Sequence, residues 1–428
     1  MRHLMRKSGP LALTTALALT LAACGGGGGG QKGNETKTQP KTQASSPAEH
    51  GEAAAADPFD ALKAAAEHVG PNGSAKALAS GIAKAAKLQG STDSKAATTY
   101  ASLSSLLGEH VYLAGIAVDT GVNFGLDSPE FKAAAGALDE NSVALSQLVG
   151  SVAGPDNEQA FLQVWRQHIG FFVDYTNGAA TNNPQLKQQA LASLDGYRMQ
   201  AGAFFEKVTG GALPASAVAT ELKGHIQTLT AAIDAAVAKD PTVFAKLRQA
   251  AHHVNAGGSS KALTGGIAKA AQMEGSVNDP AAQAYAKLSN ILQEHVYLSG
   301  LAVKTAFASG LDSPAFKAAA ETLDENSVEL SQLVGSVAGP DNEQAFLQLW
   351  REHIGFFVDY AKGTATNNPQ LKQQALASLD GYRMQAGAFF EKVTGGALPA
   401  TAVAESLKGH IQTLTKAIDS LAAVVVKK

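Results

Sequence analysis

A long internal repeat constrains the fold more than any other feature of the sequence. Each position of the first copy has its counterpart 185 positions further along without a gap, from the pair Phe59 and Phe244 onward. The copies are nearly identical from Leu138 to Thr230 and differ at many positions before that stretch. Solenoid and propeller repeats are only about 20–50 residues long, so this period indicates two whole domains. We expect one at 58–239 and the other at 240–428.

Helix signals are dense in each copy, and alternating runs of β-branched residues, which would predict strands, are nearly absent. In the first copy we expect two short helices and five longer ones, at 59–69, 74–88, 94–123, 128–153, 155–177, 183–209 and 214–239. Ser128, Pro129 and Glu130 give one of the long helices a capping residue, a proline in its first turn and an acid. Short loops join antiparallel neighbours, so the expected fold class is all-α, with two tandem up-and-down helical bundles.

The first 24 residues have the layout of a secretory signal. Arg2 and Lys7 belong to a basic start, and the apolar run that follows, 11–21, is too short to span a bilayer. The segment Leu-Ala-Ala-Cys at 21–24 resembles a lipobox, the motif at which bacterial lipoproteins are cleaved and acylated on the cysteine, here Cys24. This resemblance implies an extracytoplasmic, membrane-anchored lipoprotein, at the cell surface or the periplasmic face. The alternative is an ordinary secretory signal with a chance cysteine.

Residues 25–57 are expected to form a flexible stalk, because six glycines are followed by a polar stretch that cannot bury a core. Cys24 is the single cysteine, which excludes disulfides and thiolate metal sites. The net charge is −3, and no basic block stands out beyond the stalk. We therefore expect the lipid anchor to bring a membrane as partner, and we expect no nucleic acid.

Three of the five long helices carry a histidine within their apolar stripe. His110, His168 and His225 each lie among apolar residues spaced three and four apart, near the middle of the helix. Midpoints lie at one level in an antiparallel bundle, so the three imidazoles should share a layer. Asn141 and Tyr197 lie at the same depth on the other two long helices. The second copy repeats the set with His295, His353, His410, Asn326 and Tyr382.

Such a layer needs partners, because burying a polar group without a hydrogen bond costs about 1–3 kcal/mol. Three converging imidazoles are a usual ligand set for Zn, Cu or Fe, and haem held by two histidines is a further option. The sequence thus predicts a surface protein that binds a metal ion, or haem, in each bundle for storage, scavenging or sensing. The alternative is a structural or interaction module in which the histidines form only a hydrogen-bond network.

Acidic residues beside the stripes are candidates to accept hydrogen bonds from the imidazoles, as Asn141, Tyr197 and their counterparts are. These residues are Asp139 and Asp195 in the first copy, and Asp324 and Asp380 in the second. Arg198, three residues after Asp195, is a competing partner for that carboxylate. His68 and His253, at the ends of the short first helices, are expected to cap those helices.

Enzyme motifs give no positive signal. The sequence lacks paired Glu-x-x-His motifs for a di-iron site, His-Glu-x-x-His for a zinc peptidase and Gly-x-Ser-x-Gly for a hydrolase. An enzyme is therefore not predicted. Three neutral ligands leave an open position at a metal, which keeps a redox enzyme as a weaker third option.

Several short motifs resemble a known helical domain. They are Glu109-His110, Leu-Asp-Glu-Asn at 138–141, Trp-x-x-His-Ile-x-x-Phe-Val-x-Tyr at 165–175 and Gly-His at 224–225. Similar elements occur in a helical domain of secreted Gram-positive proteins that often accompanies a module named for the N-terminal domain of copper amine oxidases. The resemblance covers about residues 95–235 and 280–420. It implies secretion and a helical fold, but no metal, because the copper in that name belongs to the neighbouring module.

Overall fold

The computed structural model describes residues 58–426, which form fourteen helices and no strand. The first repeat contributes α1 (Pro58–Val69), α2 (Ser74–Ala85), α3 (Lys95–Phe124), α4 (Pro129–Ala153), α5 (Pro155–Ala180), α6 (Pro184–Val208) and α7 (Ala215–Val237). The second contributes α8 (Val243–Val254), α9 (Ser260–Ala270), α10 (Pro280–Ser309), α11 (Pro314–Ala338), α12 (Pro340–Ala365), α13 (Pro369–Val393) and α14 (Ala400–Val425). The all-α fold class is confirmed, whereas Cys24 and the predicted stalk lie outside the described residues.

Local sequence signals account for most helix ends. The Ser128 side chain accepts a hydrogen bond from the Phe131 backbone N–H at the start of α4, as its capping position predicts. One expected end is wrong, because α5 continues through Gly178 to Ala180. A Cβ at Gly178 would lie 2.8 Å from the backbone nitrogen of Lys187 on α6. This glycine therefore permits close packing of two helices and does not end one.

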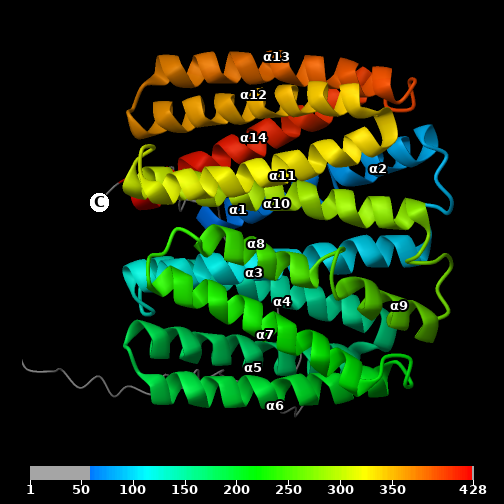
Figure 1. Cartoon of the computed structure of the whole chain (residues 1–428), viewed down its shortest axis with the longest axis vertical. Helices are drawn as coiled ribbons and strands as arrows, with labels where there is room; N and C mark the ends of the chain where they lie inside the picture. The colour runs from blue at the N-terminus through cyan, green and yellow to red at the C-terminus, as the bar shows by residue number, and fades with distance from the viewer. Residues whose placement is uncertain (1–57, 427–428) are drawn as a thin grey trace, which may run out of the picture. The chain divides into compact units, whose positions relative to one another are not determined.

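The five long helices of each repeat pack in chain order, as Figure 1 shows. In the first repeat α3 contacts α4, α4 contacts α5, α5 contacts α6 and α6 contacts α7, and α7 closes the bundle against α3 and α5. The helices α10 to α14 make the corresponding contacts in the second repeat. The long helices thus form one bundle per repeat, with the apolar stripes turned inward.

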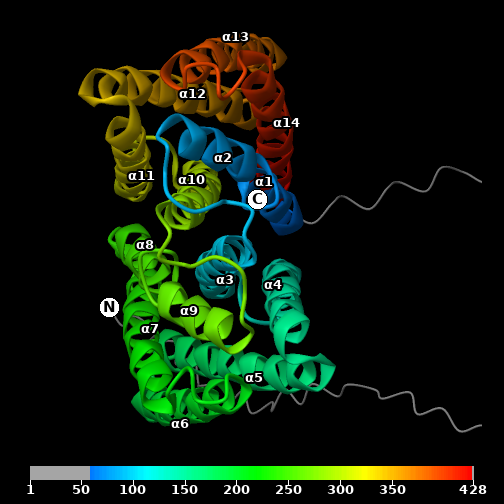
Figure 2. The same cartoon turned by 90° about the vertical axis from the view of Figure 1, so that its right-hand side faces the viewer.

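The short helices are exchanged between the repeats (Figure 2). The helices α1 and α2 pack on α10 and α14 of the second bundle, whereas α8 and α9 pack on α3 and α7 of the first. The chain reverses after α7, where Lys239 adopts a left-handed conformation, and α8 folds back onto α7. Each bundle is therefore completed by two helices of the other repeat, so the sequence repeats 58–239 and 240–428 do not coincide with the packing units.

Equivalent residues of the two repeats meet where α3 packs against α10. The rings of Tyr112 and its counterpart Tyr297 stack with centroids 5.5 Å apart and planes 8° from parallel. Asp119 forms an ion pair with Lys304, which occupies the same position in the second repeat. Contacts between equivalent positions are typical of an interface with two-fold symmetry, here within one chain.

The helix α3 is long and apolar enough to cross a membrane, and it is the one such helix among residues 58–426. In its most apolar window, 78% of the residues are buried inside the structure. The two layers that cover α3 account for this composition, because it packs against its own bundle and also against α10.

Candidate metal centre

Three histidines of each bundle converge at one level, as their sequence register predicts. His110 on α3, His168 on α5 and His225 on α7 place one ring nitrogen each within 4.8 Å of the other two. His295, His353 and His410 do the same in the second bundle. All six side chains are at most 5% exposed. The structure thus contains two buried histidine triads with the spacing of potential metal ligands.

Aromatic side chains hold the first triad in place. Trp165, one turn before His168, contacts the rings of both His110 and His168, with centroid distances of 4.8 and 4.5 Å. Tyr197 on α6 stacks on His168 at 4.7 Å and 18°. Phe172 meets His225 edge to face at 5.8 Å. Because these rings fill the layer around the imidazoles, the triad is set by packing of the core.

Burial keeps the imidazoles neutral. It lowers the pKa of His168 to about 3 and the pKa of His225 to about 4, and it places the pKa of His110 well below its usual value. The pKa values of His353, His410 and His295 are lowered in the same way. At neutral pH all six rings are therefore in the form that binds metal ions.

The hydrogen bonds of the triads are incomplete. In the first bundle the Nε2 atoms of His168 and His110 lie 3.4 Å apart, within hydrogen-bond distance. The Nδ1 atoms of His110 and His225 have no hydrogen-bond partner among residues 58–426. In the second bundle both ring nitrogens of His295 and of His410 lack such a partner. A purely structural network would leave these buried nitrogens unsatisfied, at a cost of about 1–3 kcal/mol each.

The residues expected to support the imidazoles divide into two groups. Tyr197 and Tyr382 do contact the triads, by stacking on His168 and His353. Asn141 instead donates hydrogen bonds to Glu109 Oε1 and to the Leu106 carbonyl, both at 3.0 Å. Its counterpart Asn326 bonds Glu294 and the Ile291 carbonyl in the same way.

Arginines bind the candidate aspartates at the surface. Asp139 accepts two hydrogen bonds of 2.7 Å from Arg166, and Asp195 accepts one of 2.6 Å from Arg198. The pairing of Arg198 with Asp195, three residues back, is thus confirmed. In the second bundle Arg351 binds Asp324 and Arg383 binds Asp380. The structure thus pairs these carboxylates with guanidinium groups and not with imidazoles.

His68 and His253, in the last turns of α1 and α8, tie the exchanged helices to their host bundles. The Nε2 atom of His253 on α8 lies 2.9 Å from the Glu221 carbonyl of α7, and that of His68 on α1 lies 3.1 Å from the Ser406 carbonyl of α14. A Cβ at Gly224 would lie 2.5 Å from the His253 ring. The glycine of the Gly-His motif therefore makes room for the other repeat.

A second buried polar cluster, which is not among the sequence predictions, lies between the repeats. Glu294 is 3% exposed and receives hydrogen bonds from Arg248 at 2.7 Å and Tyr112 at 3.0 Å, with His252 Nε2 at 2.9 Å. Its counterpart Glu109 is 2% exposed. One sequence feature could have indicated these buried glutamates. The segment Glu-His-Val-Tyr-Leu occurs at both 109–113 and 294–298, although the surrounding halves of the repeats differ.

The two buried glutamates differ in charge because their neighbours differ. Burial raises the pKa of Glu109 to about 7, although Asn141 and the charge of Lys63 oppose this shift. Burial also favours the neutral form of Glu294, but His252 and Arg248 outweigh it and hold the pKa of Glu294 below its usual value. His252, Glu294 and Glu329 lie within metal-binding distance of one another. Arg248 already binds both carboxylates there, so this group does not favour a metal.

Comparisons of the chain with protein-family models, curated proteins and solved structures found no match. We therefore infer function from the geometry and chemistry of the histidine triads. The resemblance to a helical domain of secreted Gram-positive proteins stays a prediction.

Proposed function

We propose that each bundle binds one transition-metal ion through its three core histidines. The ligands are His110, His168 and His225 in the first bundle, and His295, His353 and His410 in the second. The observation that carries this proposal is the convergence of three neutral, buried imidazoles from three helices within 4.8 Å. A single core histidine is commonly satisfied by a neighbour, but three at one point are a typical ligand set.

The spacing of the nitrogens suits a small ion. A metal–nitrogen bond of about 2.1 Å and a tetrahedral angle place two ligand atoms about 3.4 Å apart. The Nε2 atoms of His110 and His168 lie at that distance. The third imidazole nitrogen, at most 4.8 Å from the other two, then needs a shift of about 1.5 Å at most to reach the same spacing.

The donor set narrows the choice of metal. Three neutral nitrogens without thiolate or carboxylate suit Zn, Cu or Fe better than Mg or Ca, which prefer oxygen ligands. Haem fits poorly, because its macrocycle would have to lie between two axial imidazoles. A third imidazole within 4.8 Å of both would overlap that plane. We therefore propose a bare ion, with one coordination position left open.

The N-terminal sequence supports a location of this protein outside the cytoplasm, at a membrane. A lipid on Cys24 would anchor it outside the cytoplasm, and the glycine-rich segment after it would hold the bundles away from the membrane. An anchored protein with two buried ion sites suits storage, scavenging or sensing of a metal at the cell surface.

Cobalt substitution tests the coordination directly. Co(II) added to metal-free protein should give the intense visible absorption of a tetrahedral site, saturating at two ions per chain. The change of His168 and His353 to alanine should abolish this absorption. The matched control changes His68 and His253, which bind backbone carbonyls, and should keep it. Weak octahedral absorption, or the same spectrum in the His168→Ala, His353→Ala protein, would refute coordination by the triads.

A further inference from the structure

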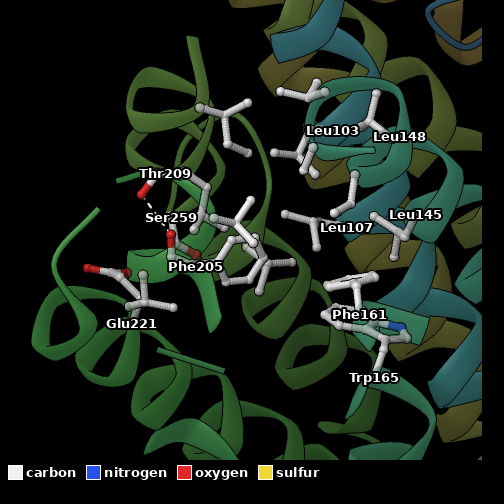
Figure 3. A pocket seen from close by; sticks show the side chains of 18 of the residues that line it. Leu103, Leu107, Leu145, Leu148, Phe161, Trp165, Phe205, Thr209, Glu221 and Ser259 are labelled. Carbon is white, nitrogen blue, oxygen red and sulfur yellow. Dashed lines mark hydrogen bonds between the residues drawn. The ribbon is translucent and has the colours of Figure 1, made fainter. Parts of the chain in front are cut away.

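An apolar cavity of about 150 Å³ lies beside the first histidine triad. His110 and His225 form part of its wall, together with Trp165 and apolar side chains of α3, α4, α6, α7, α8 and α9. Figure 3 shows leucines of α3 and α4 on one side of it, with Glu221 and Ser259 on the opposite side. The cavity therefore reaches from the core imidazoles to the contact between the bundle and the exchanged helix α9.

The second bundle has the corresponding cavity, but its volume is only about 50 Å³. His295 and His410 line it, and most of its other residues match those of the first cavity. The two cavities are thus lined by equivalent residues and differ threefold in volume. Among the equivalent residues that line both cavities, only the pair Glu221 and Ser406 differs in type.

One lining position joins the exchanged helix to the bundle in the second cavity and differs in the first. Ser406 on α14 donates a hydrogen bond of 2.6 Å to Ser74, the first residue of α2, and so joins the exchanged helix to the bundle. The first bundle has Glu221 at the position of Ser406. Ser259, the counterpart of Ser74, donates to the His253 carbonyl, as Ser74 does to the His68 carbonyl. Glu221 has no hydroxyl, so the first bundle cannot form the serine pair that joins α14 to α2 in the second.

We propose that the first cavity binds one small, uncharged, apolar molecule, no larger than a benzene ring, next to the histidine triad, and that the second cavity excludes it. Apolar protein cavities of about 150 Å³ bind benzene or xenon. Charged molecules would lose their hydration on entering this lining, and the Glu221 carboxylate disfavours anions. A cavity of about 50 Å³ is too small for the same molecule.

This inference deepens the proposed metal function and rests on it for one step, the contact of the molecule with the metal. An ion held by three imidazoles keeps an open position. Since His110 and His225 also line the cavity, a molecule bound there lies beside the ion. The two bundles would then differ in role, with an accessible centre in the first and a closed centre in the second.

Benzene binding to the metal-free full-length chain tests the cavity. Calorimetric titration should show one site per chain in the wild type. The Glu221→Ser protein, which restores the serine pair found in the second bundle, should bind at least tenfold more weakly. The reciprocal Ser406→Glu protein should gain a second site. No binding by the wild type, two equal sites in it, or unchanged affinity in Glu221→Ser would overturn the proposal, with circular dichroism confirming that each variant is folded.

A second titration separates this proposal from the metal function. In the Co(II)-loaded wild type, benzene should shift the visible absorption of one ion and leave that of the other unchanged. An unchanged spectrum despite benzene binding would refute contact between the molecule and the metal. If the chain binds no Co(II), the metal proposal fails, and benzene binding to the metal-free chain still decides whether the cavity is a binding site.

Discussion

Acidification should destabilise the metal-free protein strongly between pH 7 and pH 5. An unfolded histidine takes up a proton near pH 6.5, whereas the folded triads do so only at a much lower pH, since the pKa is about 3 for His168 and about 4 for His225. The folded pKa is depressed, so the stability from these groups is complete above pH 6.5. It is lost as the pH falls toward the folded values.

The size of this loss follows from the shifts. The value pH 5 lies about 1.5 units below the pKa of an unfolded histidine. Each imidazole that stays neutral in the folded protein therefore lowers the free energy of unfolding by about 2 kcal/mol at this pH. Six such imidazoles together remove about 12 kcal/mol, which compares with a total stability of about 5–15 kcal/mol for a typical protein. We therefore expect metal-free protein to unfold near pH 5.

Urea unfolding followed by circular dichroism at several pH values measures this loss. The His168→Gln, His353→Gln protein lacks two of the six imidazoles, so its stability should fall by about 4 kcal/mol less between pH 7 and pH 5. The change of His50 to glutamine, in the predicted stalk, is the control for the number of histidines and should leave the fall unchanged. A stability that stays flat between pH 7 and pH 5 would refute the reasoning, since it would mean that the imidazoles take up protons in the folded state.

Three further predictions concern the metal, the buried glutamates and the exchange of helices. Zinc loading should move acid unfolding to lower pH, because ligated imidazoles cannot take up protons; an unchanged midpoint would contradict this. The folded pKa of Glu109, about 7, lies above its unfolded value, so stability is lost as the pH rises from 4.5 through 7. Urea unfolding at pH 8 should therefore show the Glu109→Gln protein to be more stable than the wild type by about 3 kcal/mol. Glu294→Gln should instead destabilise it by about 3 kcal/mol, because Arg248 loses a buried partner; equal effects of the two changes would contradict this. A chain of residues 240–428 should sediment as a dimer, because its α8 and α9 cover the bundle of another repeat; a stable monomer would refute the exchange.

The sequence predicts well those features that depend on one helix at a time. Apolar spacing and capping residues place the helices within a few residues, and the same spacing places His110, His168 and His225 on buried faces. Their common depth follows from the positions of the histidines near helix midpoints. The convergence of the imidazoles is therefore predictable without knowing which helices are neighbours.

Features that depend on the partner of a helix are not predictable in this way. The apolar face of α1 shows that it is covered but not by which bundle, and both bundles offer nearly the same surface. Glu109 lies about a hundred degrees from His110 around α3, outside the apolar stripe that predicts the core of its own bundle. In the structure that face packs on α10, so Glu109 is buried. Asp139, close to the stripe in sequence, is bound by Arg166 from the neighbouring helix.

Elemental analysis of the purified full-length chain tests the metal proposal most directly. After loading with zinc and removal of free ions, we predict two ions per chain in the wild type. We predict one in His168→Ala and none in the protein that also carries His353→Ala. A wild type without bound metal, or an unchanged metal content in the doubly substituted protein, would contradict the assignment of the two histidine triads as metal sites.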